Sequence, residues 1–240
     1  MKYLASVSYD GSKFFGFQRL NDDPSVQGEL ERVLTKINKK SVEVKGAGRT
    51  DRGVHALDQK IHFELDVNIP VSHIKEAMNS LLNPYVHIND VKEVDDDFHA
   101  RFSVIKKQYD YYINIGEYDP IKEDYLYNYN RELDIEAMKE ASKYLLGGHS
   151  FEVFTAGERD NYDSIIYDIN FEVVDNIIKI SFIGKSFYRY MVRNLVGALL
   201  VIGQGKAEPK DIEKVFKTGK NVLNFVTAPS NGLYLKEIIY

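Results

Sequence analysis

The sequence predicts an α+β protein built around a mainly antiparallel sheet. Strand-like segments with alternating apolar and polar residues occur in both halves of the chain, and amphipathic helical patterns occur between them. Two of the strand-like segments, 165–174 and 177–183, are separated only by Asp175-Asn176, which is the spacing of a hairpin with a two-residue turn. Because antiparallel neighbours can be joined by such short turns, we expect the antiparallel arrangement to dominate.

The first half of the chain contains four strand patterns and two helix patterns. Each helix pattern has apolar residues three and four positions apart and begins at a typical start signal, Ser25 for the first and Pro70 for the second. In chain order we expect a strand at 2–9, a helix from Ser25 to about Ile37, a strand begun by Val42 and Val44, a strand through Ile61, Phe63 and Leu65, a helix from Pro70 to Leu82, and a strand at 86–94.

The second half has similar parts in a similar order. Asp134 is a typical residue at the start of a helix, and Gly147-Gly148 is a typical end. In chain order we expect a strand at 109–115, a helix from Asp134 to Gly147, the hairpin described above, a long helix from about Phe187 to Ile202, a short helix after Pro209 and a strand at 233–240.

We expect two similar subdomains that share the sheet, with a cleft between them. The chain has no low-complexity linker, and the only plausible seam lies near residues 95–107. The predicted division therefore gives an N-terminal subdomain of residues 1–104 and a C-terminal subdomain of residues 105–240.

Composition excludes several classes of protein. The 240 residues include no Cys, which excludes disulfides, thiolate catalysis and zinc sites built on Cys. No apolar run reaches the length of a membrane span, and the N-terminal residues lack the layout of a signal peptide. We therefore expect a cytoplasmic protein with no membrane partner.

The net charge of −5 argues mildly against a nucleic-acid partner, but the distribution of charge matters more than its sum. The basic residues gather in three groups that form a cationic cleft if the fold brings them together. They are Lys39, Lys40, Lys45, Arg49 and Arg52; Arg101, Lys106 and Lys107; and Lys185, Arg189 and Arg193.

The most informative segment is the glycine-rich stretch 46–56, which holds one carboxylate between two arginines. Asp51 follows Arg49 by two positions and directly precedes Arg52. Neighbouring guanidinium groups keep a carboxylate ionised. Such an acid suits a nucleophile or base that meets an anionic substrate, although a tight turn joined by an Asp–Arg surface pair gives the same pattern.

Other chemistries have little support in the sequence. No pair of His residues has metal-ligand spacing, and no phosphate-binding loop or nucleophile elbow occurs. We expect His55 to anchor the loop through a backbone hydrogen bond. Glycoside hydrolysis needs two carboxylates, and only Asp58 lies near Asp51.

Two residues in the second half are candidate partners of Asp51. Tyr109 begins a strand beside two lysines, where a tyrosine packs in a core or stacks on a nucleobase. Arg189 and Arg193 lie four positions apart and, on the expected long helix, share one face. Arg193 is flanked by apolar residues and so needs an acid partner, for which Asp51 is the natural candidate.

Five motifs in order make the chain resemble the TruA-type pseudouridine synthases over essentially its whole length. Each motif alone would be a weak signal. They are Tyr9-Asp10-Gly11 with Phe15-Gly16-Phe17-Gln18; Gly48-Arg49-Thr50-Asp51-x-Gly53-Val54-His55-Ala56; Phe98-His99-Ala100-Arg101-Phe102 with Tyr109-x-Tyr111; Phe187-x-x-x-Met191-Val192-Arg193-Asn194; and Ala228-Pro229-x-x-Gly232-Leu233-x-Leu235.

This resemblance implies a pseudouridine synthase fold and a set of site residues. Asp51 is implied to be the catalytic aspartate, acting on a uridine flipped from its stack. Tyr109 is implied to stack on the uracil, and Arg193 to pair with Asp51. Arg49 is implied to occupy the space of the flipped base, and Leu233 to line the pocket.

The same resemblance implies the reaction and the partners. The N-glycosidic bond of the uridine is broken, the uracil is rotated while it stays bound, and it is rejoined to the ribose through C5, without cofactor or metal. The resemblance also implies a homodimer that holds a tRNA anticodon stem-loop, with target uridines at positions 38 to 40.

The chain departs from the family pattern at three places. Phe17 stands where the family usually has Trp, and Arg52 stands where a small residue is common. A region that commonly carries basic residues in the family here reads Glu158-Arg159-Asp160-Asn161-Tyr162-Asp163. Three alternatives therefore stay open: an enzyme for another tRNA site, an enzyme for ribosomal RNA, and a non-catalytic RNA-binding module or tRNA-folding chaperone.

Overall fold

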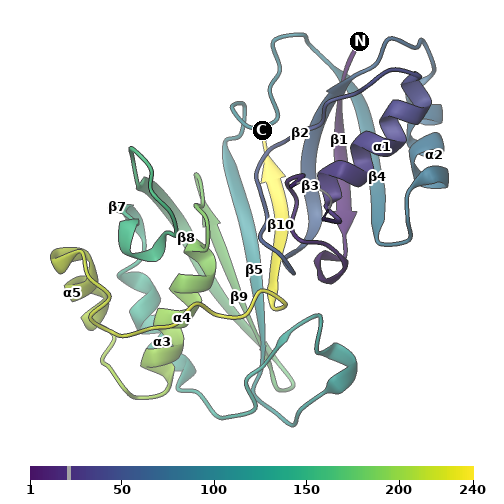
Figure 1. The fold of residues 1–240 in the computed structure, drawn as a ribbon. Helices are drawn as coiled ribbons and strands as arrows, with labels where there is room; N and C mark the ends of the chain where they lie inside the picture. The colour runs from purple at the N-terminus through teal and green to yellow at the C-terminus, as the bar shows by residue number, and fades with distance from the viewer. Residues whose placement is uncertain (21–22) are drawn as a thin grey trace. The chain divides into compact units, whose positions relative to one another are not determined.

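Strands and helices follow one another along the chain and assemble into two units. The structure is a computed structural model that describes residues 1–20 and 23–240. Unit 1 comprises Met1–Ile105 together with Tyr234–Tyr240, and unit 2 comprises Lys106–Leu233 (Figure 1).

The sheet of unit 1 is built around a strand that is apolar and buried along most of its length. Its strands are β1 (Lys2–Tyr9), β2 (Lys45–Gly46), β3 (His55–Glu64), β4 (Val86–Val94) and β10 (Leu233–Ile239). The central strand β1 pairs antiparallel with both β3 and β4, so that Ala5 lies opposite Ile61 and Val91. β2 adds to β3 in antiparallel orientation, whereas β10 adds to it in parallel.

Two amphipathic helices of unit 1, α1 (Val26–Asn38) and α2 (Val71–Leu81), contact each other, and α2 also packs on β4 (Figure 1). Ser25 caps the first helix, because its hydroxyl oxygen accepts the Gly28 N–H at 3.3 Å. The buried face of α1 carries the apolar residues that the spacing predicted, which are Val26, Leu30, Val33 and Leu34.

Unit 2 contains four strands in antiparallel order and one short strand that pairs in parallel. Its strands are β5 (Lys106–Asn114), β6 (Tyr127–Asn128), β7 (Gly147–Ser150), β8 (Asp163–Val174) and β9 (Ile177–Gly184). β9 lies between β5 and β8, and β7 pairs with the far side of β8. The short β6 runs parallel to β5.

Unit 2 contains the helices α3 (Ile135–Lys143), α4 (Met191–Gly203) and α5 (Asp211–Thr218). The apolar α4 packs against α3 and is buried at eleven of its thirteen residues (Figure 1). None of the helices in the described part of the chain combines the length and the apolar character needed to cross a bilayer.

The α+β class and the mainly antiparallel sheets are confirmed, but several boundaries differ from the prediction. The long helix begins at Met191 and not near Phe187, because Tyr190 has a left-handed backbone with φ 63°. Arg189 therefore precedes α4 and does not share a helical face with Arg193. The helix at Asp134 ends before Gly147, which begins β7.

Two further differences concern the sheets. Val42 and Val44 are buried but lie outside any strand, and β2 comprises only Lys45 and Gly46. The last strand was expected to belong to the C-terminal subdomain. It extends the sheet of unit 1 instead, because Tyr234 and Leu235 pair with His55 and Ala56 of β3.

A buried histidine in β3 gives unit 1 a pH-dependent stability. His62 is only 6% exposed and its Nδ1 accepts the Ala100 N–H at 3.0 Å. Its ring lies edge-on to His99, with 4.7 Å between centroids. Burial, helped by the charges of His99, Lys2 and Lys45 and opposed by Glu43, lowers the pKa of His62 to about 4.

We expect acidification from pH 7 to pH 4 to destabilise the protein through His62. Below about pH 6.5 the unfolded chain binds a proton that the folded His62 refuses, so stability falls as the pH drops. The pKa shift corresponds to a loss on the order of 3 kcal/mol by pH 4. Urea unfolding at pH 7 and pH 4 measures this loss, which should be smaller in His62→Gln. Equal losses in both proteins would contradict the assignment.

Candidate active site

In unit 1, Asp51 lies on the loop that joins β2 to β3, and the backbone of this loop is fixed by buried partners. The Thr50 hydroxyl is 2.8 Å from the hydroxyl of Tyr9, and the Thr50 carbonyl accepts the Phe17 N–H at 3.1 Å. Burial raises the pKa of Tyr9 to about 12, so this phenol stays protonated as a hydrogen-bonding group. Asp51 itself remains partly exposed, and its carbonyl accepts the Val54 N–H at 3.1 Å.

A second contact fixes the other end of the same loop. Gly11, in the 3-10 helix η1 (Gly11–Lys13), lies so close to the loop that a Cβ atom there would be 2.0 Å from the Val54 carbonyl oxygen. Its N–H donates to Nδ1 of His55 at 3.1 Å, which confirms that His55 anchors the loop through a backbone group. The neighbouring strand β10 supports this ring, since Tyr234 lies opposite His55 in the ladder and stacks on it with 4.6 Å between centroids.

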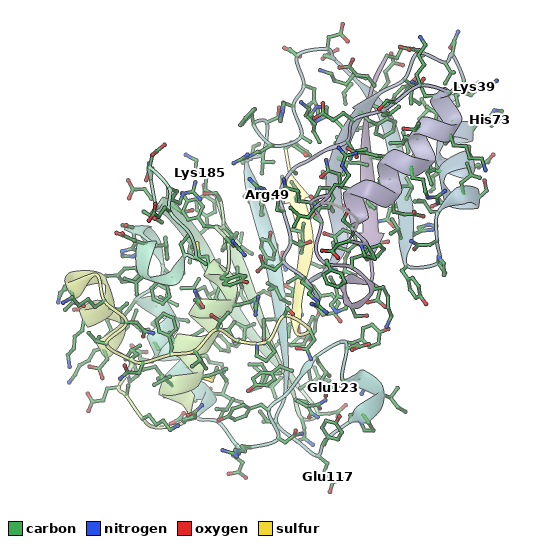
Figure 2. All side chains as sticks on the ribbon, viewed as in Figure 1. Lys39, Arg49, His73, Glu117, Glu123 and Lys185 are labelled. Atoms are coloured by element: carbon green, nitrogen blue, oxygen red, sulfur yellow. The ribbon has the colours of Figure 1, made fainter. Side chains whose placement is uncertain are left out.

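Both arginines beside Asp51 are exposed and are held by neutral groups. Arg49, which is labelled in Figure 2, donates from Nη1 to the side-chain oxygen of Gln18 at 2.7 Å. The guanidinium carbon of Arg52 lies 4.1 Å from the ring centroid of Phe15, which is 42% exposed. Hydrogen bonding to an amide and stacking on a ring orient a guanidinium without neutralising it. Both cations therefore stay available to an anion.

In unit 2, Tyr109 begins the buried part of β5. It lies opposite Phe182 of β9, and its ring meets the edge of Phe187 with 5.2 Å between centroids. The side chain is 7% exposed. A tyrosine ring held from the side in this way keeps a fixed orientation. Both readings of Tyr109 from the sequence, as a core residue and as a stacking residue, are compatible with this packing.

Arg193 lies in the first turn of α4 and is held by the chain segment that follows α5. Its Nε donates to the Ala228 carbonyl oxygen at 2.7 Å, and its own carbonyl accepts the Ala228 N–H at 3.2 Å. This segment lies directly on α4, because a Cβ atom at Gly197 would be 2.1 Å from the Val226 carbonyl oxygen. The close approach therefore sets the position of the carbonyl that orients Arg193.

Leu233 ends the same segment and begins β10. It is 5% exposed, and its N–H donates to the Ser230 carbonyl at 3.0 Å. Between Ala228 and Leu233, the Pro229 carbonyl accepts the Tyr111 hydroxyl at 2.7 Å, and burial raises the pKa of Tyr111 well above its usual value. The structure thus gathers Arg193, Leu233 and a tyrosine from β5 around one segment of unit 2.

Sequence reasoning missed two neighbours of the candidate residues. Gln18 stands at the end of the N-terminal motif but was not assigned to Arg49, because their contact joins segments far apart in the chain. Tyr190 was placed inside a helix, so its left-handed backbone was not expected. The residue type offered no signal, since only Gly, Asn and Asp commonly adopt this conformation.

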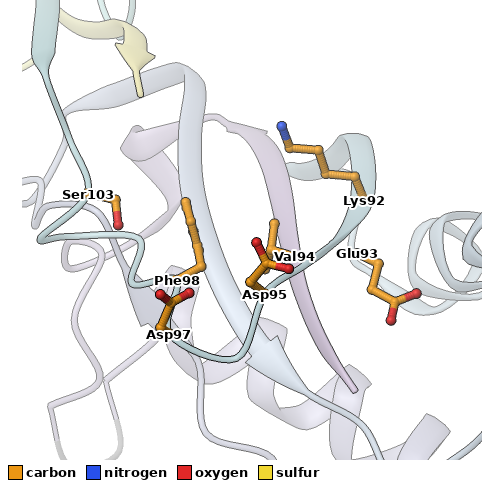
Figure 3. A pocket seen from close by; sticks show the side chains of 7 residues that line it. All are labelled: Lys92, Glu93, Val94, Asp95, Asp97, Phe98 and Ser103. Carbon is orange, nitrogen blue, oxygen red and sulfur yellow. The ribbon is translucent and has the colours of Figure 1, made fainter.

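The pocket at the end of β4 is a poor match for a polyanion. Figure 3 shows its lining residues, which come from β4 and the segment after it and include none of the candidate site residues. The lining carries the carboxylates of Asp95 and Asp97 (Figure 3). Negative charge at this position repels phosphate groups.

Comparison with known proteins identifies the family. A family model described as tRNA pseudouridine synthase matches residues 5–103 and 141–240. The tRNA pseudouridine synthase A of Listeria monocytogenes serotype 4a is 41% identical over 245 residues, which cover 100% of this chain and 99% of the relative. The proteins of the same name from Geobacillus sp. and Streptococcus agalactiae serotype Ia are each 40% identical, with 98% and 100% of this chain and 96% and 95% of the relatives covered.

The family model spans most of both units and all the motif residues above except Tyr109-x-Tyr111, which the full-length relatives cover. The mixed architecture with mainly antiparallel strands is that of the pseudouridine synthase fold. The chain belongs to the tRNA pseudouridine synthase family and is an isomerase that acts on RNA.

Proposed function

We propose that this enzyme converts uridine to pseudouridine in the anticodon stem-loop of tRNA, at positions 38 to 40, and that Asp51 is its catalytic residue. The observation that carries the proposal is the Asp51 loop itself. Its backbone is fixed at Thr50 and Val54, its carboxylate side chain is partly exposed, and the arginines on both sides keep their charge. Catalysis requires such a preorganised acid, whereas RNA binding alone does not.

In the proposed reaction the glycosidic bond between C1′ and N1 of the target uridine breaks, and a bond between C1′ and C5 forms. The proton on C5 is lost to solvent and N1 gains one, so atoms and charge balance and no oxidant or reductant is needed. Asp51 acts on the flipped nucleotide as nucleophile or base. Tyr109 stacks on the uracil and holds it while it rotates.

The remaining site residues have supporting roles in this proposal. Arg193, oriented by the Ala228 carbonyl, pairs with Asp51 and keeps the carboxylate ionised. Arg49 fills the space that the flipped base leaves in the RNA stack, and Leu233 lines the uracil pocket. Arg52 supplies a further positive charge for the RNA backbone next to Asp51.

We further propose that the enzyme acts in the cytoplasm as a homodimer that holds one stem-loop per site. Sedimentation equilibrium of the purified protein with and without tRNA measures the assembly. A single monomeric species in both samples would overturn this part of the proposal.

The target is tested by incubating the purified enzyme with unmodified tRNA and, separately, with ribosomal RNA, followed by chemical sequencing for pseudouridine. We expect modification at tRNA positions 38, 39 or 40 and none in ribosomal RNA. Modification only at other sites would overturn the anticodon assignment and leave the chemistry intact. RNA binding without turnover on either substrate would overturn the catalytic role and favour the chaperone alternative.

A further inference from the structure

Side chains of α1 hold the backbone of unit 1 just before β2. Val44, the last residue before β2, is only 1% exposed. Its N–H donates to Oε1 of Glu31 at 3.1 Å, and its carbonyl accepts Nε2 of Gln27 at 2.9 Å. Buried backbone groups need such partners, which a neighbouring strand usually provides. Here two side chains take the place of that strand, which explains why Val44 is buried outside a ladder.

Gln27 and Glu31 form one connected pair, called the α1 clamp below. They lie four positions apart on the helix and so share a face. Nε2 of Gln27 also donates to Oε1 of Glu31 at 3.1 Å. Glu31 is 6% exposed, and its other oxygen, Oε2, lies 2.9 Å from Nη1 of Arg19. A buried carboxylate held by several polar groups keeps a fixed position.

The α1 clamp also holds the chain segment that precedes the helix. Oε1 of Gln27 accepts the Arg19 N–H at 3.0 Å, and the backbone N–H of Gln27 donates to the Phe17 carbonyl at 2.9 Å. Gln18, which receives the hydrogen bond from Arg49, lies between these two contacts. The clamp therefore ties the segment 17–19 to the segment that enters β2.

Both of these segments bear directly on the Asp51 loop. The N–H of Phe17 donates to the Thr50 carbonyl at 3.1 Å. The ring of Phe17 packs on the backbone of β2, because a Cβ atom at Gly46 would be 2.6 Å from its Cε1. From Val44 the chain runs through β2 into the loop itself. The separation of the two segments thus sets where the loop begins and where Thr50 is held.

We propose that Gln27 and Glu31 are positioning residues of this enzyme: by holding segment 17–19 and Val44 at a fixed separation, they set the backbone of the loop that carries Asp51. The inference rests on the proposed function, in which Asp51 is catalytic. The clamp acts through the backbone and does not contact the RNA. Its loss should therefore lower the rate of the chemical step more than the affinity for RNA.

Three variants separate the hydrogen bonds of the α1 clamp from its shape. Gln27→Glu keeps the shape but has no N–H group for the Val44 carbonyl, and Glu31→Ala removes the acceptor of the Val44 N–H. We expect kcat on tRNA to fall at least about tenfold in both variants, with KM within about threefold of wild type. Glu31→Gln keeps an acceptor oxygen, so its kcat should stay within about threefold of wild type.

Glu29→Ala is the matched control on the same helix. The Glu29 carboxylate also accepts a backbone N–H from another segment, that of Asn83 at 3.0 Å, and it pairs with Arg32. This contact holds the chain ahead of β4 and not the Asp51 loop. We expect the control to have a lower urea midpoint than wild type but the wild-type kcat and KM.

Hydrogen exchange follows the contact with the loop without using activity. The Phe17 amide, which donates to Thr50, is compared with the Ala5 amide in the central strand β1, which reports the opening of the whole unit. We expect the ratio of the Phe17 exchange rate to the Ala5 exchange rate to rise at least about tenfold in Gln27→Glu and Glu31→Ala. The ratio should keep its wild-type value in Glu29→Ala.

Four results would overturn the inference. They are wild-type kcat in Gln27→Glu and Glu31→Ala, a loss confined to KM, an equal loss of kcat in Glu29→Ala, and an unchanged exchange ratio in the two clamp variants. Asp51→Asn is measured in parallel. If Asp51→Asn is fully active, the proposed function fails; if it is inactive while both clamp variants keep full kcat, the inference about the α1 clamp alone fails.

Discussion

Asp51→Asn is expected to reduce pseudouridine formation by at least about a thousandfold while the protein stays folded. The amide is neither a nucleophile nor a base, so it cannot act on the flipped uridine. The fold should survive because the contacts that fix the loop use the backbone and side chain of Thr50 and the carbonyl of Asp51, which the substitution leaves in place. Release of tritium from C5 of uracil-labelled tRNA under single-turnover conditions measures the effect.

Asp58→Asn is the matched control for this prediction. Asp58 is an aspartate of β3, paired with Lys60 at 2.6 Å and hydrogen-bonded by the Ser6 hydroxyl, and it has no role in the proposed mechanism. We expect its variant to release tritium at the wild-type rate. Comparable activity in wild type and Asp51→Asn, with both proteins folded by circular dichroism, would show that another group performs the chemistry.

Gly11→Ala is expected to have the largest effect among substitutions outside the proposed catalytic residues. The added Cβ atom would lie 2.0 Å from the Val54 carbonyl oxygen, 2.3 Å from its carbon and 3.0 Å from the His55 nitrogen. All three are backbone atoms, so no side chain can move aside. We expect about 2–3 kcal/mol of destabilisation from the forced shift, and about a hundredfold loss of kcat/KM because the Asp51 loop moves with Val54.

Urea unfolding and steady-state kinetics on tRNA measure the two effects of Gly11→Ala together. Gly148→Ala serves as the control, since a Cβ atom at Gly148 would have its nearest neighbour, Cγ1 of Ile165, at 3.9 Å. That variant should match wild type in both measurements. Wild-type activity in a destabilised Gly11→Ala protein would mean that the loop holds its geometry without this contact.

Elements with strong local signals were predictable from the sequence. The hairpin around Asp175 is confirmed as β8 and β9, because the left-handed φ of 53° at Asp175 is what a two-residue turn between antiparallel strands requires. The start of α1 at Ser25 and that of α3 at Asp134 are also confirmed, since each side chain caps its helix. These signals lie within a few residues of the feature that they predict.

Features that depend on contacts between distant segments were not predictable in the same way. The long helix was extended back to Phe187 because the apolar pattern continues there, and nothing in the local sequence shows that the chain turns at Tyr190. The strand predicted to begin at Val42 and Val44 begins only at Lys45, because the two valines are buried without pairing in a ladder. The carboxylate of Asp51 was a candidate from its neighbours, but the contacts of its loop with Tyr9 and Gly11 come from the fold.

Because β10 belongs to unit 1 but follows unit 2 in the chain, unit 1 stays incomplete during most of the synthesis of the protein. β3 receives β10 as its parallel neighbour, and His55, which anchors the Asp51 loop, stacks on Tyr234. During synthesis, Met1–Ile105 leaves the ribosome before all of unit 2, so this edge of β3 has no partner strand until β10 emerges. Translation that stops anywhere inside unit 2 thus yields a polypeptide that carries Asp51 but lacks the strand that supports its loop.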